Sequence, residues 1–359
     1  MITQEDLPEL EGFSFIRLLG RGGMASVWEA RQKEPDRIVA IKILNEDISD
    51  RPEEVESFYA EAKRAAQLDH ENIVTVFEVG CQNGHYYYVM EFAAGYDTGK
   101  WLKRKGQLKP DDVLTIAEST AVALNYAEKT LGIIHCDIKP ANLMVDGDGT
   151  VRITDLGISR VVRGPNINDG YICGTPSFMS PEQARGESLD VRADIYSLGA
   201  TLYNLVTGHK LFADRSENEI MEAQGREQVR DLRDFCPAAS YPFAVLVSQM
   251  LAKDRRLRPL NWSFVIRDMQ RVRQGLMPLG DMPGPGESTM ALNPPSAADA
   301  AIASQSEAAL EPTRKMKPRE RLTAMSGKHR RGMAVYITVT ALLALAAFAL
   351  AYFVTAALV

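Results

Sequence analysis

The chain has 359 residues, about the length of two ordinary domains, and its 45% hydrophobic and 25% charged content is typical of a globular protein. This composition excludes a wholly disordered chain, and the net charge of −6 argues against a basic nucleic-acid-binding protein, so no nucleic-acid partner is expected. The charge is unevenly distributed, because residues 312–331 carry eight Lys or Arg and one Glu, which leaves −13 for the rest.

The cysteines and the first residues indicate a reducing compartment. Cys81, Cys136, Cys173 and Cys236 show no paired spacing, which argues against a disulfide framework and a zinc site. Residues 1–10 are acidic and lack a cationic start followed by an apolar run, so we predict no secretory signal. The globular part is therefore expected in the cytosol.

The first 92 residues are rich in predicted strands. β-Branched and aromatic residues, several of them alternating, indicate strands at 13–20, 25–31, 38–44, 72–80 and 85–92. A helix is predicted over 52–68, where Val55, Phe58, Ala62 and Ala65 recur at helical spacing. Glu61 lies beside Phe58 and Ala62 on this pattern, so its carboxylate is predicted to point inward.

After Pro110 the periodicity becomes mainly helical, as in 111–132 and 193–208. A small β-rich part therefore precedes a larger helical part.

Two motifs of the β-rich part suggest phosphate chemistry. The sequence Gly20-Arg-Gly22-Gly23-Met-Ala-Ser-Val27 joins two predicted strands, and glycines let backbone N–H groups approach phosphate oxygens. Alone, this segment is equally a plain turn. Lys42 lies in an apolar strand and needs a partner if it is buried, because an unpaired ammonium is costly there; Glu61 is a candidate.

Three further motifs follow in the helical part. Residues 133–144, IIHCDIKPANLM, place polar groups between apolar runs, and 153–157, ITDLG, repeat that arrangement. Residues 174–182, GTPSFMSPE, come after a polar loop. Together the five motifs, by order and spacing, resemble the eukaryotic-like (Hanks-type) Ser/Thr protein kinases, particularly their bacterial branch. The resemblance covers residues 13–272.

This resemblance implies the α+β, two-lobed protein-kinase fold, with a small β-rich N-lobe, a large α-helical C-lobe and ATP between them. The hinge would lie at 90–93. The implied nucleotide-binding residues are Leu19, Gly20, Gly22, Gly23, Val27, Ala40, Lys42, Glu61, Met90, Glu91, Ala93 and Met144. Val27, Ala40, Met90 and Met144 would form the walls around adenine, although each is equally explained as ordinary core.

The same resemblance implies the catalytic roles. Lys42 would hold the α- and β-phosphates, and Glu61 would orient it. Asp137 would accept the proton of the substrate hydroxyl, and Lys139 would neutralise the γ-phosphate. Asn142 and Asp155 would hold Mg²⁺, or Mn²⁺, through oxygen ligands.

Three other residues are assigned structural roles by the resemblance. Glu182 would close the activation segment and pair with Arg258, whereas Asp194 would brace the catalytic loop. Thr175 would serve the active site.

Three positions depart from the family pattern. Ala25 replaces the third glycine, and Leu156 replaces the usual Phe after the metal-binding Asp155. Cys136 replaces the arginine that ordinarily pairs with a phosphorylated activation-loop residue, and a thiol cannot form that pair.

The substitution at Cys136 suggests two regulatory hypotheses. Residues 161–170 contain no hydroxyl, and Ser159, Tyr171 and Ser177 are poor phosphorylation candidates, so activation-loop phosphorylation is not expected to switch the enzyme on. Alternatively, Cys136 and Cys173 form a redox switch, against the simpler interpretation of small buried hydrophobic residues.

The C-terminal quarter changes in composition. Residues 275–311 are rich in Pro, Gly, Ser and Ala and are predicted to form a disordered linker. Residues 333–359 contain no charge and are long enough to span a bilayer as a helix. The basic segment 312–331 precedes this span and should remain in the cytoplasm, where it is expected either only to fix the topology or also to contact anionic lipid.

We therefore expect a single-pass, tail-anchored protein on the cytoplasmic membrane, with residues 1–331 inside the cell. The predicted function is phosphate transfer from ATP to protein Ser/Thr hydroxyls, including autophosphorylation. A homodimer through the small lobe is a further implication of the resemblance. The alternatives are a nucleotide-binding pseudokinase scaffold and a small-molecule kinase; the intact set Lys42, Glu61, Asp137, Asn142 and Asp155 argues against the first, and Lys139 with 174–182 against the second.

Overall fold

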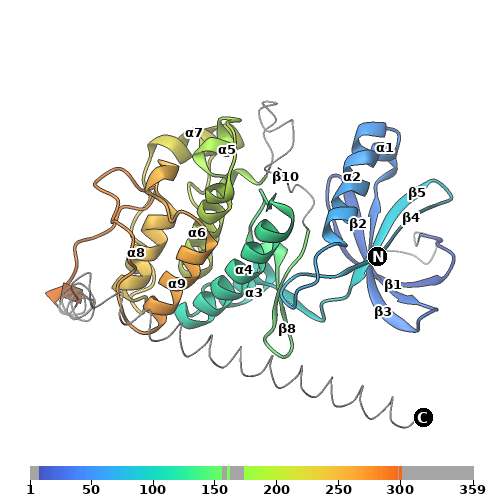
Figure 1. The fold of residues 1–359 in the computed structure, drawn as a ribbon, viewed down its shortest axis with the longest axis horizontal. Helices are drawn as coiled ribbons and strands as arrows, with labels where there is room; N and C mark the ends of the chain where they lie inside the picture. The colour runs from blue at the N-terminus through green and yellow to red at the C-terminus, as the bar shows by residue number, and fades with distance from the viewer. Residues whose placement is uncertain (1–7, 156–159, 162–173, 298, 301–359) are drawn as a thin grey trace, which may run out of the picture. The chain divides into compact units, whose positions relative to one another are not determined.

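A computed structural model describes residues 8–155, 160–161, 174–297 and 299–300. The first of its two units, Met1–Asp299, contains a β-rich lobe and a helical lobe (Figure 1). The predicted two-lobed α+β organisation is confirmed.

The N-lobe is an antiparallel sheet of five strands in the order β1-β2-β3-β5-β4. The strands are β1 (Phe13–Arg21), β2 (Ala25–Gln32), β3 (Arg37–Leu44), β4 (Val76–Gln82) and β5 (His85–Glu91). Two helices accompany them, α1 (Glu46–Ser49) and α2 (Pro52–Ala65).

Strand β3 is covered on both faces, and the strand period of two decides which residue goes where. Val39, Ile41 and Ile43 pack into one core cluster with Trp28, whereas Leu44 packs with Phe58 of α2 on the other face. The same alternation places Lys42 on the α2 face, the side from which Glu61 can reach it.

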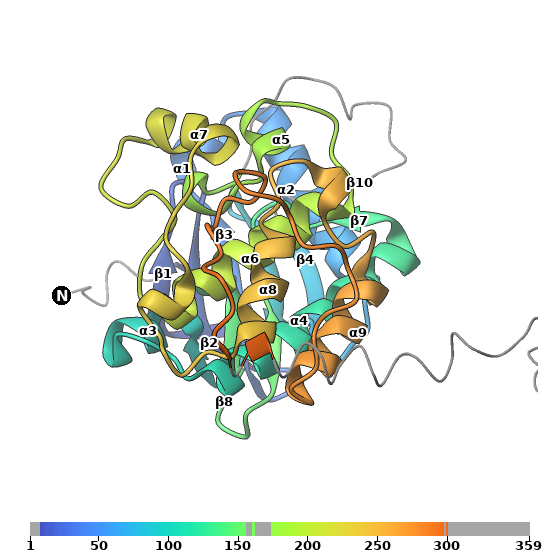
Figure 2. The same ribbon diagram turned by 90° about the vertical axis from the view of Figure 1, so that its left-hand side faces the viewer.

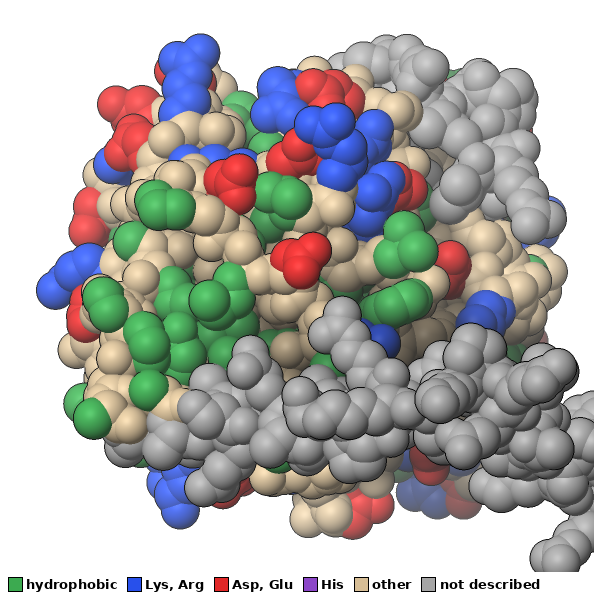
Figure 3. Space-filling model, turned by 60° about the vertical axis from the view of Figure 1, so that its left-hand side comes forward, with side chains coloured by type: hydrophobic (Ala, Val, Ile, Leu, Met, Phe, Trp, Pro, Cys, Tyr) green, Lys and Arg blue, Asp and Glu red, His purple; other side chains and the backbone are tan. Residues whose placement is uncertain are grey.

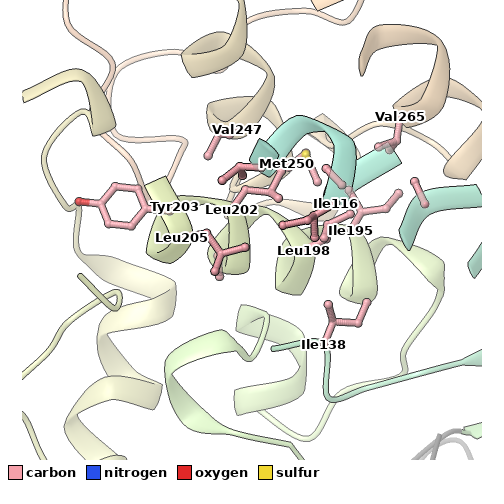
Figure 4. Close-up of a cluster of buried hydrophobic side chains, with 14 of the residues drawn as sticks. Ile116, Ile138, Ile195, Leu198, Leu202, Tyr203, Leu205, Val247, Met250 and Val265 are labelled. Atoms are coloured by element: carbon pink, nitrogen blue, oxygen red, sulfur yellow. The ribbon is translucent and has the colours of Figure 1, made fainter. Parts of the chain in front are cut away.

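The C-lobe is built mainly from helices. They are α3 (Thr98–Lys105), α4 (Pro110–Leu131), α5 (Pro181–Ala184), α6 (Val191–Thr207), α7 (Glu217–Arg226), α8 (Tyr241–Met250) and α9 (Trp262–Arg273). Every residue of α6 except Arg192 is buried, as expected for a helix that is surrounded on all sides. Figure 4 shows Ile195, Leu198 and Leu202 of α6 among side chains from the neighbouring helices.

Short elements carry the loops of the site. They are the strands β6 (Gly95–Asp97), β7 (Ile133–Ile134), β8 (Leu143–Asp146), β9 (Val151–Ile153) and β10 (Arg160–Val161), and the 3₁₀ turns η2 (Pro140–Asn142), η3 (Pro176–Phe178), η4 (Leu232–Asp234) and η5 (Arg255–Leu257). β6, β8 and β9 form one sheet, and β7 pairs with β10. The segment before β4 is tied to the C-lobe, because Val74 N–H donates to the Ile153 carbonyl at 3.0 Å.

The prediction of a disordered linker from residue 275 is wrong for its first part. Residues 287–291, which we call the C-terminal strap, pack against the C-lobe, and Ser288, Thr289 and Met290 are buried. Figure 2 shows the orange segment after α9 running alongside α8. Backbone hydrogen bonds to distant segments supply the order that the Pro- and Gly-rich composition of the surrounding segment does not provide. The remaining linker residues 301–311 lie outside the described residues.

Exposed ion pairs occur on the surface. Figure 3 shows basic and acidic side chains interspersed on one face of the molecule. Arg185–Glu187 at 2.5 Å and Arg256–Asp254 at 2.6 Å are two exposed pairs of the C-lobe. Solvated pairs of this kind contribute about 0–1 kcal/mol each to stability.

No helix within the described ranges is long and apolar enough to cross a membrane. The predicted span 333–359 and the basic segment 312–331 both lie outside those ranges.

Candidate active site

The predicted lysine–glutamate pair is formed between β3 and α2. Lys42 Nζ lies 3.2 Å from Glu61 Oε1, which also accepts a hydrogen bond from the Tyr88 hydroxyl at 2.9 Å. Lys42 also forms an ion pair with Asp155 of the C-lobe. The two lobes therefore meet at one buried ammonium group.

Charge pairing in this cluster competes with burial. Burial opposes ionisation of Lys42, but its acidic neighbours outweigh burial and raise its pKa. The Asp155 carboxyl is partly exposed, and although desolvation opposes its ionisation, the Lys42 ammonium lowers its pKa below the usual range. Burial raises the pKa of Glu61 despite the neighbouring ammonium. Lys42 and Asp155 are thus charged at neutral pH.

The glycine-rich turn joins β1 and β2 as a hairpin. Gly22 N–H donates to the Ala25 carbonyl at 2.9 Å, and Asn45 Nδ2 donates to the carbonyls of Gly22 and Gly23 at 3.1 and 3.0 Å. A Cβ at Gly20 or Gly23 would meet nothing described within 4 Å, so their backbone is open to a ligand. Sequence reasoning missed Asn45, because the glycine motif does not indicate which distant side chain holds it.

The strand register brings the predicted adenine-wall residues onto one face. Val27 pairs with Lys42, and Ala40 pairs with Met90, so these residues follow each other across the sheet. Ala40 is buried, whereas Val27 and Met90 are half-buried. This pattern fits side chains that border a cleft.

The remaining predicted nucleotide-binding residues lie on the hinge and its neighbours. Glu91 N–H donates to the Thr75 carbonyl at 2.8 Å, and the Ala93 carbonyl accepts from Gly95 N–H at 2.9 Å. Half-buried Met144 pairs with Asp97 between β8 and β6, and Leu19 lies half-buried on β1. The structure shows their position, and their contact with ATP stays a prediction.

The catalytic loop gathers three predicted residues around one carboxylate. Lys139 Nζ lies 2.6 Å from Asp137 Oδ2, and Thr175 Oγ1 donates to Asp137 Oδ1 at 2.8 Å. Lys139 Nζ also donates to Thr175 Oγ1 at 2.9 Å. Asp137 is buried, so these contacts hold its carboxylate in a fixed orientation.

Two oxygen donors fit a magnesium ion that also binds phosphate. Asn142 Nδ2 donates to the Asp137 carbonyl at 2.9 Å, an arrangement that presents the amide oxygen as the ligand, and Asp155 supplies a carboxylate. Asp155 has a left-handed backbone, with φ of 60°. The described part of the chain holds no cluster of three or more His, Cys, Asp or Glu suited to a metal. Magnesium bound through one or two side chains and phosphate oxygens needs no such cluster.

The catalytic loop is held from behind by α6 and α5. Asp194 accepts hydrogen bonds from the backbone N–H groups of His135 and Cys136 at 2.7 and 2.8 Å, as its bracing role requires. Gln183 Nε2 donates to the Cys136 carbonyl at 2.8 Å. Sequence reasoning missed Gln183, although the capping box that it forms with Ser180 was a readable signal.

Cys136 occupies an apolar environment. It packs in a cluster with Ile134, Leu189 and Ala193, and its thiol lies 3.7 Å from the Ile134 carbonyl. Its proposed redox partner Cys173, and the candidates Ser159 and Tyr171, lie outside the described residues, as does Leu156.

The predicted pair Glu182–Arg258 is formed and deeply buried. Arg258 Nη1 and Nη2 donate to the two Glu182 oxygens at 2.6 and 2.9 Å. This bidentate pair fixes the end of the activation segment to the C-lobe.

A sheet lobe and a helical lobe that meet at Lys42 and Asp155, beside a loop carrying Asp137 and Asn142, define the class of ATP-dependent kinase folds. Residues 13–266 match the protein kinase domain, and the chain belongs to this family.

Several bacterial proteins are similar to this chain. The chain is 33% identical over 243 residues to the serine/threonine-protein kinase PrkC of Bacillus subtilis. This alignment covers 67% of this chain and 37% of the relative. It is 38% identical over 201 residues to the serine/threonine-protein kinase pkn3 of Myxococcus xanthus, covering 53% of this chain and 37% of the relative. It is 39% identical over 203 residues to the serine/threonine-protein kinase PknA of Mycobacterium tuberculosis, covering 55% of this chain and 47% of the relative. The alignments thus span less than half of each relative's length.

Proposed function

We propose that this chain is a protein-serine/threonine kinase that transfers the γ-phosphate of ATP to protein hydroxyls, its own included. The observation that carries the proposal is the Asp137 carboxylate held by Lys139 and Thr175. The Ser/Thr specificity is supported by the printed names of the relatives and by Lys139 within the catalytic loop.

The chain's own residues account for the chemistry. Asp137 accepts the proton of the substrate hydroxyl as its oxygen attacks the γ-phosphorus and the bond from that phosphorus to ADP breaks. Lys139, in contact with that carboxylate, places a positive charge where the γ-phosphate reacts. Lys42, oriented by Glu61, binds the phosphates that remain on ADP. Magnesium or manganese bound at Asn142 and Asp155 would neutralise phosphate charge.

Phosphate transfer by the purified full-length chain tests the proposal. Labelled ATP, magnesium and a generic basic protein are supplied to the wild type, Lys42→Ala and Asp137→Asn. Asp148→Asn, in the exposed turn after β8, is the matched control. We expect phosphoserine or phosphothreonine in the wild type and the control, and a loss of about 100-fold or more in the two site variants.

Other outcomes would indicate the alternatives. Nucleotide and magnesium that stabilise the wild type without any transfer would indicate a pseudokinase scaffold. Transfer to small hydroxylic compounds but to no protein would indicate a small-molecule kinase.

We also propose that activation-loop phosphorylation is not required. The apolar cluster of Cys136 with Ile134, Leu189 and Ala193 supports this proposal, because a phosphate needs a cationic partner at that place. Mass spectrometry of the active enzyme, followed by alanine substitution of any phosphosite between residues 159 and 177, provides the test. A phosphosite whose alanine variant is inactive would contradict the proposal.

Membrane attachment through residues 333–359 is a further proposal, supported by an uncharged run of sufficient length and by the basic residues before it. The full chain should remain with the membrane after alkaline extraction, and a chain ending at residue 332 should be released. Protease added to intact cells should leave the kinase domain undigested if it faces the cytoplasm.

Two partner proposals rest on the sequence alone. The segment 312–331 should bind anionic vesicles at about 1 kcal/mol per basic residue, and binding that salt does not weaken would contradict this. The homodimer implied by the family resemblance should sediment as a dimer; a monomer at all concentrations would exclude it.

A further inference from the structure

The C-terminal strap, residues 287–291, lies outside the residues that match the kinase family, 13–266. It is hydrogen bonded on both sides by backbone groups. Val229 N–H donates to the Thr289 carbonyl at 2.8 Å, and Thr289 N–H donates to the Leu251 carbonyl at 2.9 Å. The strap is therefore fixed in register between two segments of the C-lobe, with Thr289 at its centre.

A chain of buried side chains leads from the strap to the activation segment. Thr289 Oγ1 lies 2.9 Å from the Tyr196 hydroxyl, which donates to Gln224 Oε1 at 2.5 Å. Gln224 Nε2 in turn donates to the Pro176 carbonyl at 3.0 Å. Thr289, Tyr196 and Gln224 are all fully buried, so water does not compete for these bonds.

Each hydrogen bond between Thr289 and Pro176 is donated in the same direction, from the strap toward the activation segment. A carbonyl can only accept, so the Gln224 amide nitrogen faces Pro176 and its oxygen faces Tyr196. The Tyr196 hydroxyl donates its proton to Gln224. The Tyr196 oxygen is therefore left to accept the hydrogen bond that the Thr289 hydroxyl donates. Burial raises the pKa of the Tyr196 hydroxyl, so it remains a donor at neutral pH.

These hydrogen bonds end at Pro176, next to the catalytic group. Pro176 begins η3, and its neighbour Thr175 donates to Asp137 at 2.8 Å. The position of the Pro176 carbonyl therefore affects where the Thr175 hydroxyl lies. Tyr196 also packs against the Arg258 guanidinium, with 4.9 Å from Cζ to the ring centroid, and Arg258 anchors Glu182 at the other end of the same segment.

We propose that Thr289 is a positioning residue for the phosphoacceptor side of the reaction. Through Tyr196 and Gln224 it holds the segment 174–180, the surface on which a protein substrate is aligned beside Asp137. This inference rests on the proposed kinase function. It makes the strap part of the enzyme rather than the start of a tether.

Thr289→Val in the full-length chain is the main test, because valine keeps the shape and removes the hydroxyl. The KM for a generic basic protein should rise about three- to tenfold, the factor expected for one lost buried hydrogen bond, while the KM for ATP stays within twofold. Ser288→Ala is the matched control, since this neighbouring buried hydroxyl bonds to the Ser248 carbonyl instead. Thr289→Ser should restore the wild-type KM.

Two further measurements separate positioning from stability. Hydrogen exchange of the 174–180 backbone should be faster in Thr289→Val than in wild type or Ser288→Ala. Tyr196→Phe should give the same rise in KM, and combining it with Thr289→Val should add little, because both break one chain of bonds.

The outcomes are decisive in each case. Thr289→Val that behaves like Ser288→Ala, or that raises both KM values equally, overturns the proposal, as does unchanged exchange at 174–180. If the wild type transfers no phosphate, the proposed kinase function fails, and hydrogen exchange alone still decides whether Thr289 holds this segment.

Discussion

The ion pair of Glu182 with Arg258 gives the most quantitative prediction. Both side chains are almost completely buried, at 2% and 0% exposure, and two hydrogen bonds of 2.6 and 2.9 Å join them. Arg258 also donates to three backbone carbonyls, those of Ala252, Arg192 and Lys253. Glu182→Gln keeps the size of the side chain but removes its charge and replaces one of the two accepting oxygens with a donating NH2 group.

The expected cost follows from the unpaired charge that remains. Removing one partner of a buried ion pair costs about 3–5 kcal/mol, because the other charge stays desolvated without a counter-ion. The three carbonyls continue to bind the guanidinium, so we expect about 3 kcal/mol, at the low end of that range. With a urea m-value of about 3 kcal/mol/M, the unfolding midpoint should fall by about 1 M.

Urea unfolding followed by tryptophan fluorescence, to which the buried Trp262 of the C-lobe contributes, measures this change. The control is Glu187→Gln, because Glu187 pairs with Arg185 at 2.5 Å but both side chains are about half exposed. This control should lower stability by about 0.5 kcal/mol or less. Equal effects of Glu182→Gln and Glu187→Gln would refute the reasoning that burial, rather than distance, determines the cost.

Three other changes test separate parts of the fold. Gly95→Ala would place a Cβ 1.9 Å from the Val145 carbonyl oxygen, so it should lower stability by about 1–3 kcal/mol in urea unfolding, whereas Gly147→Ala, with open space around it, should not. Burial raises the pKa of Asp194 from 3.8 to about 6. At a pH between these two values, Asp194 therefore binds a proton in the folded protein but not in the unfolded chain. The free energy of unfolding of the wild type should therefore rise by about 2 kcal/mol, relative to Asp194→Asn, as the pH falls from 7 to 4, and an unchanged difference would contradict this. A fragment ending at residue 275 should be less stable than one ending at 299 by about 3 kcal/mol or more, the scale of losing the buried Met290 side chain, in thermal unfolding followed by circular dichroism.

The sequence was sufficient where a local period decides which side a residue faces. The helical spacing of Phe58 and Ala62 predicts Glu61 on the buried face, and Lys42 in its apolar strand needs a charged partner. Their contact at 3.2 Å confirms Glu61 as that partner, and the alternation along β3 explains why Lys42 faces α2. The same holds for α4 and α6, whose apolar patterns and bounds agree with the predicted helices to within about two residues.

The sequence was insufficient where order depends on partners far along the chain. The strap lies in a segment rich in Pro, Gly and Ser and has too little apolar surface to predict its burial. Its backbone partners Val229 and Leu251 lie about 60 and 40 residues earlier. Asn45 and Gln183 are similar cases, since each holds a backbone carbonyl that local pattern cannot identify.

These distant contacts bear on how the catalytic loop keeps its shape. Cys136 has a left-handed backbone, with φ of 68°, a conformation that a non-glycine residue adopts only when its surroundings enforce it. Asp194 binds its N–H group and Gln183 binds its carbonyl, so both backbone groups are fixed from the C-lobe. Both contacts come from side chains of the C-lobe, so the backbone next to Asp137 is oriented by α5 and α6. This arrangement supports the proposal that the enzyme is active without phosphorylation of its activation loop.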